Sequence, residues 1–374
     1  MKVPAIDLKA QYEKIGEEVE RAVAEVVREQ MFILGPAVEK FEIEVARYLG
    51  AKYAIGVSSG SDALLLSLMA LGIGPDDEVI TPAFTFFATA GCIARLGAKP
   101  VFVDIRPDTF NIDVMQVKES ITRRTRAIIP VHLYGQPAEI EDIVQAGGKY
   151  GAPVVEDACQ AMGARINRKA AGTFGLAGCF SFYPSKNLGA WGEGGLIVTE
   201  DDRLSRLLRS LRNHGEMGRY RNERIGINGR MHGIQGAVLS VKLKYLDEWN
   251  AARRDAAARY DGLFRDAGLG EFVKTPVSTG GGHIYHQYVI RAARRDDLLE
   301  DLRDEGIGCT VYYPEPLHLQ PCFSELHYKK GDLPHTEQAC REVLALPIYP
   351  EITEEQQRYV VDKIKEFYEK REGK

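Results

Sequence analysis

Cysteine is scarce in this chain of 374 residues, and its six copies are scattered. No CxxC pair and no short chelating spacing occurs among them, so the sequence predicts no metal site. Thiols distributed in this way are typical of reduced cysteines, which favours a cytoplasmic protein. The six are Cys92, Cys159, Cys179, Cys309, Cys322 and Cys340.

The sequence also lacks a surplus of positive charge. Lys and Arg number 48 against 53 Asp and Glu, for a formal net charge of −5. Such a chain has no basic field that would favour nucleic acid or an anionic membrane. No apolar stretch is long enough to span a bilayer, and residues 1–23 are charged and amphipathic, unlike a signal peptide. We therefore expect no nucleic-acid or membrane partner.

Two glycine-rich nucleotide motifs are missing as well. The chain contains no GxxxxGK[ST] phosphate loop and no GxGxxG fingerprint. Nucleotide hydrolysis and dinucleotide binding thus lose their usual sequence support.

What the sequence does contain is a regular alternation of helical patterns with short apolar runs. Helical patterns cover residues 11–29, 37–48, 61–72, 85–96, 138–150 and 203–212. The apolar runs, which we expect to form strands, cover residues 78–81, 100–104, 127–131, 153–156, 179–182 and 195–199. This alternation predicts an α/β protein with a mostly parallel sheet and helices on both faces.

The pattern changes after Arg230. A long helix is predicted from about Met231 to Phe264, and a smaller α+β region follows it. That region is expected to contain strands over 287–291 and 309–313 and helices over 295–305 and 353–368. We place a domain boundary in the long helix near residue 245, which gives a large domain over 1–245 and a small domain over 246–374.

Polar residues follow several predicted strands, where ligands bind in open α/β sheets. Ser58-Ser59-Gly60-Ser61-Asp62 precedes a clear helix. Helix capping alone explains such a segment, but exposed N–H groups, a glycine and the helix dipole would also suit an anion. Glu156 and Asp157 end another strand, and two successive acids suggest that at least one points into the cleft.

Two further segments lie at strand ends. Phe84, Phe86 and Phe87 fall in a turn after a strand, where an aromatic face could meet a planar ligand, although core packing is the commoner role. Lys186 lies between two apolar runs in FSFYPSKNLGAWGEGGLIV (180–198). A lysine near a glycine-rich turn is usually a surface residue, but desolvation would lower its pKa and make it an imine-forming nucleophile.

Together these four segments match the requirements of pyridoxal phosphate. The phosphate would bind at the helix N-terminus, an aromatic would lie against the pyridine ring, and a carboxylate would keep the ring nitrogen protonated. The lysine would form the Schiff base with the aldehyde. No single segment supports this cofactor by itself.

An ordered series of motifs along almost the whole chain resembles the DegT/StrS family of sugar aminotransferases. The series consists of DLKAQY (7–12), FILGP (32–36), SSGSDAL (58–64), PDDEVITPAFTF (75–86), PVFVDI (100–105), PVHLYGQP (130–137), EDACQAMGA (156–164), SFYPSKNLGAWGEGG (181–195), RNHG (212–215), GINGRM (226–231), YYPEPLHLQP (312–321) and LPIYPE (346–351). The resemblance implies the fold-type I pyridoxal phosphate architecture, with a mostly parallel seven-stranded sheet in the large domain and a smaller α+β domain.

The resemblance also implies roles for particular residues. Lys186 would be the Schiff-base lysine and Asp157 the partner of the ring nitrogen. The other implied cofactor contacts are Phe86 stacked on the ring, Gln160 near its hydroxyl, and Gly60, Ser61 and Ser181 at the phosphate. Asn228 would reach the phosphate in the neighbouring subunit, which would make a homodimer part of each active site.

The implied activity is transfer of an amino group from L-glutamate to a nucleotide-linked keto-sugar, with pyridoxamine phosphate and 2-oxoglutarate formed on the way. Relatives that act as dehydratases carry histidine at the lysine position, so Lys186 favours transamination. A non-catalytic regulator would be expected to lose part of the set Lys186, Asp157 and Asn228, and none is lost. Met162 departs from the histidine common in relatives, which argues against a role in proton transfer.

No motif specifies the sugar or the nucleotide. FILGP and the segment after Lys186 resemble the members that act on 3-keto sugars more than those that act on 4-keto sugars. The candidate substrates are dTDP-linked 3-keto-6-deoxyhexoses and UDP-linked 3-keto-N-acetylglucosaminuronate, with roles in amino-sugar, surface-polysaccharide (such as O-antigen) or antibiotic-sugar synthesis. Candidate substrate contacts, for each of which a structural role is an equal alternative, are Arg219, Tyr220, Arg230, Tyr313 and His318.

Overall fold

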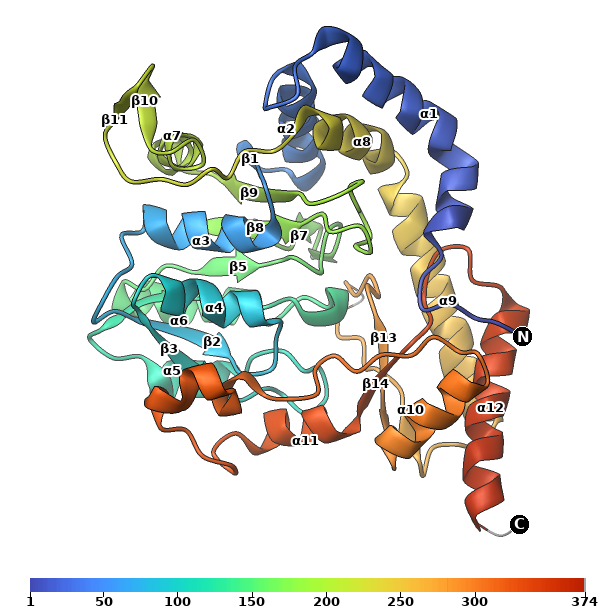
Figure 1. Cartoon of the computed structure of the whole chain (residues 1–374). Helices are drawn as coiled ribbons and strands as arrows, with labels where there is room; N and C mark the ends of the chain where they lie inside the picture. The colour runs from blue at the N-terminus through green and yellow to red at the C-terminus, as the bar shows by residue number, and fades with distance from the viewer. Residues whose placement is uncertain (281, 373–374) are drawn as a thin grey trace.

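Seven short strands form the central sheet of the computed structural model, which describes residues 1–280 and 282–372 (Figure 1). They are β1 (Tyr53–Val57), β2 (Glu78–Pro82), β3 (Lys99–Val103), β4 (Thr125–Ile128), β5 (Val155–Asp157), β8 (Ala177–Ser181) and β9 (Gly195–Thr199). The ladders β1-β9-β8-β5 and β3-β2-β4 are joined by the parallel bridges Ile128–Val154 and Val131–Asp157. Only β9 runs antiparallel to its neighbours, so the predicted mostly parallel seven-stranded sheet is confirmed.

Helices cover both faces of this sheet (Figure 1). They are α2 (Pro36–Leu49), α3 (Gly60–Ala70), α4 (Phe87–Arg95), α5 (Val114–Ser120), α6 (Ile140–Tyr150), α7 (Asp202–Leu211) and α8 (Gly233–Leu243). A further helix, α1 (Leu8–Glu29), packs against α8. Side chains alternate between the two faces of a strand. In β8, Phe180 packs with α2 and α8, whereas its neighbour Cys179 packs with α3 and α7 on the other face.

The C-terminal part forms a smaller α+β unit (Figure 1). Its elements are α9 (Leu246–Asp266), β12 (Val273–Lys274), β13 (Tyr288–Ala292), α10 (Arg295–Asp304), η2 (Leu317–Leu319), η3 (Pro321–Leu326), α11 (Pro334–Glu342), β14 (Val343–Leu346) and α12 (Glu354–Glu372). The strands pair antiparallel in the order β12-β13-β14. Their core is shared with α9, α10 and α12 and includes Tyr260, Tyr288 and Ile364.

The long helix predicted over 231–264 is in fact two helices, α8 and α9, which separate at Lys244 and Tyr245. Lys244 Nζ and Tyr245 Oη both donate to the carboxylate of Glu18 in α1, at 2.7 and 2.8 Å. These bonds anchor the junction to α1, while α9 continues into the small unit and packs against α12. Helical periodicity does not reveal such a break, because both helices bury an apolar stripe.

The strand predicted over 309–313 was also wrong. Only Thr310 pairs with a strand residue, through the isolated bridge to Ala345, and the chain then leaves the sheet. Tyr312 and Tyr313 instead line a cavity beside the central sheet. Four further elements, β1, α5, α11 and β14, were not predicted, because they are short or lack a clear amphipathic period.

The division of the chain near residue 245 stays a prediction. Two segments pack against the unit on the other side of that boundary. Val3 belongs to the core of the small unit, where its backbone bonds to Gly306 and Gly308. Conversely, Phe323 packs against Phe102 of β3 in the large unit. Among the helices that the structure describes, none combines the length and the apolarity that a bilayer crossing requires.

Two small hairpins complete the fold. β6 (Arg165–Ile166) pairs with β7 (Lys169–Ala170), and β10 (Glu216–Gly218) pairs with β11 (Arg221–Asn222). The β10–β11 hairpin projects from the large unit beside α7, at the upper left of Figure 1. A single turn of 3-10 helix, η1 (Leu133–Gly135), follows β4.

Candidate active site

A cavity of about 600 Å³ opens at the carboxyl edge of the central sheet. Its wall is built from residues that directly follow β1, β2, β4, β5 and β8, as expected for an open α/β sheet. Because β9 is antiparallel, Glu193, which lies two residues before this strand begins, reaches the same edge. Eight of the predicted site residues line the cavity: Gly60, Ser61, Phe86, Asp157, Gln160, Ser181, Lys186 and Tyr313.

The two acids at the end of β5 point in opposite directions. Glu156 is fully buried in the core, and its carboxylate accepts from the backbone N–H groups of Gly172, Phe174 and Gly175 at 2.6–2.7 Å. His132 Nδ1 accepts from a backbone N–H, so its Nε2 carries the proton and donates to Glu156 at 2.8 Å. Asp157, the next residue, therefore faces the cavity, as the prediction required of one of the two acids.

Asp157 is held in place from two sides. Its Oδ2 accepts from Thr89 Oγ1 at 2.8 Å, and Thr85 and Thr89 share a hydrogen bond at 3.0 Å. Its Oδ1 accepts from the backbone N–H of Cys159 at 3.2 Å. A carboxylate bonded in this way is fixed in orientation and can present its charge to a cationic ring nitrogen.

The N-terminus of α3 forms the part of the wall that is suited to an anion. The Ser59 hydroxyl caps the helix by accepting from the N–H of Asp62 at 3.0 Å. Helix capping, the alternative considered for this segment, therefore accounts for Ser59. The first N–H groups of a helix have no intrahelical acceptor, and here Gly60 and Ser61 line the cavity. A Cβ at Gly60 would lie 2.6 Å from Ser181 Cβ and 2.9 Å from Cys159 Sγ. Glycine thus lets the helix end approach β8 closely.

An aromatic group lies on the same wall. Phe86 precedes α4 and is 58% exposed, so its ring is available to a ligand instead of packed in the core. Its centroid is 6.4 Å from that of Tyr313. Gln160 donates to Tyr313 Oη at 3.1 Å and accepts from the N–H of Tyr134 at 2.7 Å, which fixes its amide.

Lys186 lies in the excursion between β8 and β9. The excursion is closed at its base by hydrogen bonds from Ala190 N–H to Phe182 and from Phe182 N–H to Gly194. Burial lowers the pKa of the Lys186 ammonium, and the nearby Asp157 carboxylate opposes part of this shift. The amine is therefore easier to deprotonate than a surface lysine, which is what an imine-forming nucleophile needs.

Several residues of the cavity were not predicted from the sequence. Thr85, which lines the cavity, precedes α4, and Thr89, which bonds to Asp157 from behind, lies four residues later in the first turn of that helix. Cys159 belongs to the same turn as Asp157, and burial raises the pKa of its thiol well above the usual value. His286 and Gln287 precede β13 of the small unit, where a rule about strand carboxyl ends gives no signal.

Five predicted site residues do not line the cavity of their own chain. Asn228 is exposed and pairs with Asn213 near the end of β1. Arg219 and Tyr220 form the turn of the β10–β11 hairpin, with Tyr220 87% exposed, and Arg230 donates to Asn213 at 2.8 Å. His318 is buried and its Nε2 lies 3.3 Å from Glu337, which favours the structural alternative for this residue.

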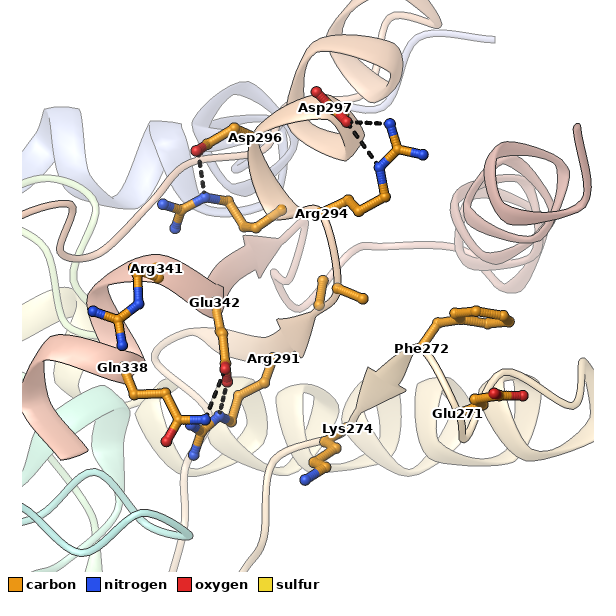
Figure 2. A pocket seen from close by; sticks show the side chains of 13 residues that line it. Glu271, Phe272, Lys274, Arg291, Arg294, Asp296, Asp297, Gln338, Arg341 and Glu342 are labelled. Atoms are coloured by element: carbon orange, nitrogen blue, oxygen red, sulfur yellow. Dashed lines mark hydrogen bonds and ion pairs between the residues drawn. The ribbon is translucent and has the colours of Figure 1, made fainter. Parts of the chain in front are cut away.

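A second large cavity, of about 520 Å³, lies in the small unit and contains none of the predicted site residues. Its charged side chains bond mainly to one another, as the dashed lines in Figure 2 show for Arg294 with Asp297 and for Arg291 with Glu342. These ion pairs occupy most of the charged groups in this cavity. Surface ion pairs of this kind contribute little to stability. The cavity at the sheet edge is therefore the candidate active site.

The residues of this site fit pyridoxal phosphate. Gly60 lets the N-terminus of α3 lie against β8, so that the free N–H groups of this helix end face the cavity and suit a phosphate. Asp157, Phe86 and Lys186 supply the carboxylate, the aromatic face and the amine in the same cavity. A family model described as the DegT/DnrJ/EryC1/StrS aminotransferase family matches residues 13–365.

The chain belongs to the DegT/DnrJ/EryC1/StrS aminotransferase family. It is 52% identical to "Pleiotropic regulatory protein" of Geobacillus stearothermophilus (98% of this chain, 99% of the relative). It is 41% identical to "dTDP-3-amino-3,4,6-trideoxy-alpha-D-glucose transaminase" of Streptomyces venezuelae (99% and 97%). It is 42% identical to "UDP-2-acetamido-2-deoxy-3-oxo-D-glucuronate aminotransferase" of Pseudomonas aeruginosa (92% and 94%).

The fold agrees with this assignment. The crystal structure of S. venezuelae DesV in complex with a ketimine intermediate superposes with a TM-score of 0.94 at 41% identity, over 98% of both chains. The expected fold-type I architecture is thereby confirmed. The protein is an aminotransferase whose cofactor is pyridoxal phosphate.

Gly60→Ala should weaken cofactor binding about tenfold or more, because the new Cβ forces the α3 N-terminus away from Ser181. Gly74→Ala is the matched control, since a Cβ there meets nothing within 4 Å. Titration of each cofactor-free variant with pyridoxal phosphate, followed by absorbance, measures the two affinities. Equal affinities for the two variants would contradict the close-approach role of Gly60.

Proposed function

We propose that this aminotransferase moves the amino group of L-glutamate to a nucleotide-linked keto-sugar. The observation that carries the proposal is the placement of the Lys186 amine and the Asp157 carboxylate in one cavity, beside the N-terminus of α3. The bound cofactor supplies an electron sink for the electrons of the broken α-carbon–hydrogen bond. Asp157 would keep that sink effective by holding the ring nitrogen protonated.

Lys186 would act as the proton carrier. Its amine lies buried in the cavity, and this desolvation lowers its pKa. A lowered pKa brings it closer to the working pH, where a group can both remove and return a proton. Lys186 would take the proton from the α-carbon of the donor and deliver it to the cofactor's C4′ atom. The same transfer in reverse would complete amination of the sugar.

Each active site would be shared between two subunits. Asn228 is exposed and lies outside its own cavity, which supports the role in a neighbouring subunit that the family resemblance implies. Arg219, Tyr220 and Arg230 belong to the same side of the large unit and would contact the nucleotide diphosphate across the dimer. Tyr313 is the remaining substrate candidate, and it lines the cavity of its own chain.

We also propose that the chain divides into a large domain and a small domain near residue 245. The enzyme would work in the cytoplasm.

The favoured sugar carries its keto group at C3. Two relatives, at 41% and 42% identity, are named for a 3-amino and a 3-oxo sugar, one linked to dTDP and one to UDP. These names support the 3-keto preference drawn from FILGP and from the segment after Lys186. They leave both nucleotides as candidates.

A panel of 3-keto and 4-keto nucleotide sugars, each incubated with L-glutamate and the holoenzyme, tests the proposal. We expect 2-oxoglutarate to form, with the new amine at C3 when located by NMR. Asp157→Asn is the control and should lose most of the rate, because an amide cannot hold the ring nitrogen protonated. Amination only at C4 would refute the 3-keto assignment, and loss of a sugar hydroxyl without amination would indicate a dehydratase.

Absence of turnover with every sugar would instead favour a regulator. The relative named a regulatory protein is 52% identical, so this outcome has to be tested directly. Retention of both Lys186 and Asp157 in the cavity supports the catalytic alternative.

Subunit mixing tests the shared site. Asn228→Ala and Lys186→Ala homodimers should each have low activity, and exchange of their subunits should restore part of it. The reason is that one site of the heterodimer combines an intact Lys186 with an intact Asn228 from the other chain. No recovery in dimers whose exchange is verified by native mass spectrometry would place Asn228 in its own chain's site.

A further inference from the structure

A small chamber of about 70 Å³ adjoins the active-site cavity on the side of the small unit. The two share the wall residues Ser185, His286, Gln287 and Tyr312, so the chamber begins one residue from Lys186. Its volume equals about two water molecules in the liquid, which suits a group of three heavy atoms. The far wall contains Arg253 of α9.

Arg253 is a buried cation with spare hydrogen-bonding capacity. Its Nη1 donates to the carbonyl oxygens of Tyr285, His286 and Ile348 at 3.0–3.3 Å. Its buried Nε has no hydrogen-bond partner, and no carboxylate among the described residues lies within ion-pair distance of the guanidinium. Burial lowers the pKa of Arg253 to about 10, with the charge of Glu351 opposing the shift, so the side chain stays positive at neutral pH.

Gln287 offers a second polar group without a partner. Its Oε1 is buried and accepts no hydrogen bond from the described residues, although the side chain borders both the chamber and the main cavity. An amide can turn to present its NH2 group instead, so Gln287 can donate to an anion in the chamber. Burying such groups without partners costs free energy, and a site that leaves them so is suited to a polar ligand.

His286 between the chamber and Lys186 is neutral. Burial lowers the pKa of its imidazole well below the usual value, and the charges of Lys186 and Arg253 lower it further. Its Nδ1 lies 3.2 Å from Asn187 Oδ1, which fixes the ring. The positive charge at the chamber wall therefore comes from Arg253.

We propose that this chamber binds the side-chain carboxylate of the amino donor, with Arg253 and Gln287 as its hydrogen-bond donors. The assignment rests on the proposed function, because it requires an acidic amino acid to react beside Lys186. The α-carboxylate of such a donor is attached to the reacting carbon and has to stay in the main cavity. The side-chain carboxylate ends a longer chain and can pass Ser185 and His286 into the chamber.

The competing explanation gives Arg253 a purely structural role. Its three carbonyl contacts tie α9 to the residues before β13 and to the segment after β14. Loss of such a tie would loosen the site for every donor alike. A carboxylate contact would matter only for donors that carry a side-chain carboxylate. The ratio of rates for two donors of the same shape separates these roles.

L-Glutamate and L-norvaline are such a pair, since norvaline has a methyl group where glutamate has its side-chain carboxylate. The first half-reaction of the holoenzyme with each donor is followed by the change in cofactor absorbance. Arg253→Met should lower kcat/KM for glutamate by about 30-fold and change the value for norvaline less than about threefold. Arg253→Lys, which keeps the charge, should recover part of the loss. Arg254→Gln, an exposed neighbour on α9, is the control and should match the wild type.

Gln287→Leu provides a second variant in case Arg253→Met does not fold, and it should lower only the glutamate value, by about five- to tenfold. Inhibition by glutarate, which has both carboxylates and no amine, should weaken in parallel in both variants. Equal losses for glutamate and norvaline, or unchanged glutarate inhibition, would overturn the chamber assignment while the transaminase stands. A wild-type enzyme that reacts with no amino donor would instead refute the proposed function.

Discussion

At the end of β5, two neighbouring carboxylates need partners on opposite sides of the sheet. Glu156 finds three backbone N–H groups and His132 in the core. Because side chains alternate along a strand, this leaves Asp157 facing the cavity, where Thr89 and the N–H of Cys159 hold it. A shift of one residue would bury Asp157 without these donors and expose Glu156, at a cost of several kcal/mol. The core thus fixes the position of the carboxylate in the active site.

The other parts of the site are arranged around that charge. Close approach at Gly60 brings the positive end of α3 to the same edge of the sheet, and the excursion between β8 and β9 brings the Lys186 amine. Burial disfavours the ammonium form of Lys186, and the charge of Asp157 offsets part of the cost. The result is a cavity with a helix end suited to an anion, a fixed carboxylate and an amine that loses its proton more readily than a surface lysine.

Much of this was predictable from the sequence, because strand ends in an α/β sheet converge and the residues that follow them can be read directly. That rule located Gly60, Ser61, Phe86, Asp157 and Lys186. It could not locate His286, Gln287 or Arg253, which come from the small unit and reach the site only through tertiary packing. The break between α8 and α9 was hidden for a similar reason, since it depends on the contacts of Lys244 and Tyr245 with Glu18.

The central assignment is that of Lys186 as the amine that holds the cofactor. Among the described lysines, Lys242 is the competitor, because burial lowers its pKa to about 8 and its Nζ donates to Gly189 at 2.8 Å. Borohydride reduction of the holoenzyme fixes the cofactor covalently to whichever lysine holds it, and peptide mapping by mass spectrometry then identifies that residue. We predict that the modified peptide contains Lys186 alone. Modification at Lys242, or no modified lysine in a protein that retains its cofactor, would contradict the account.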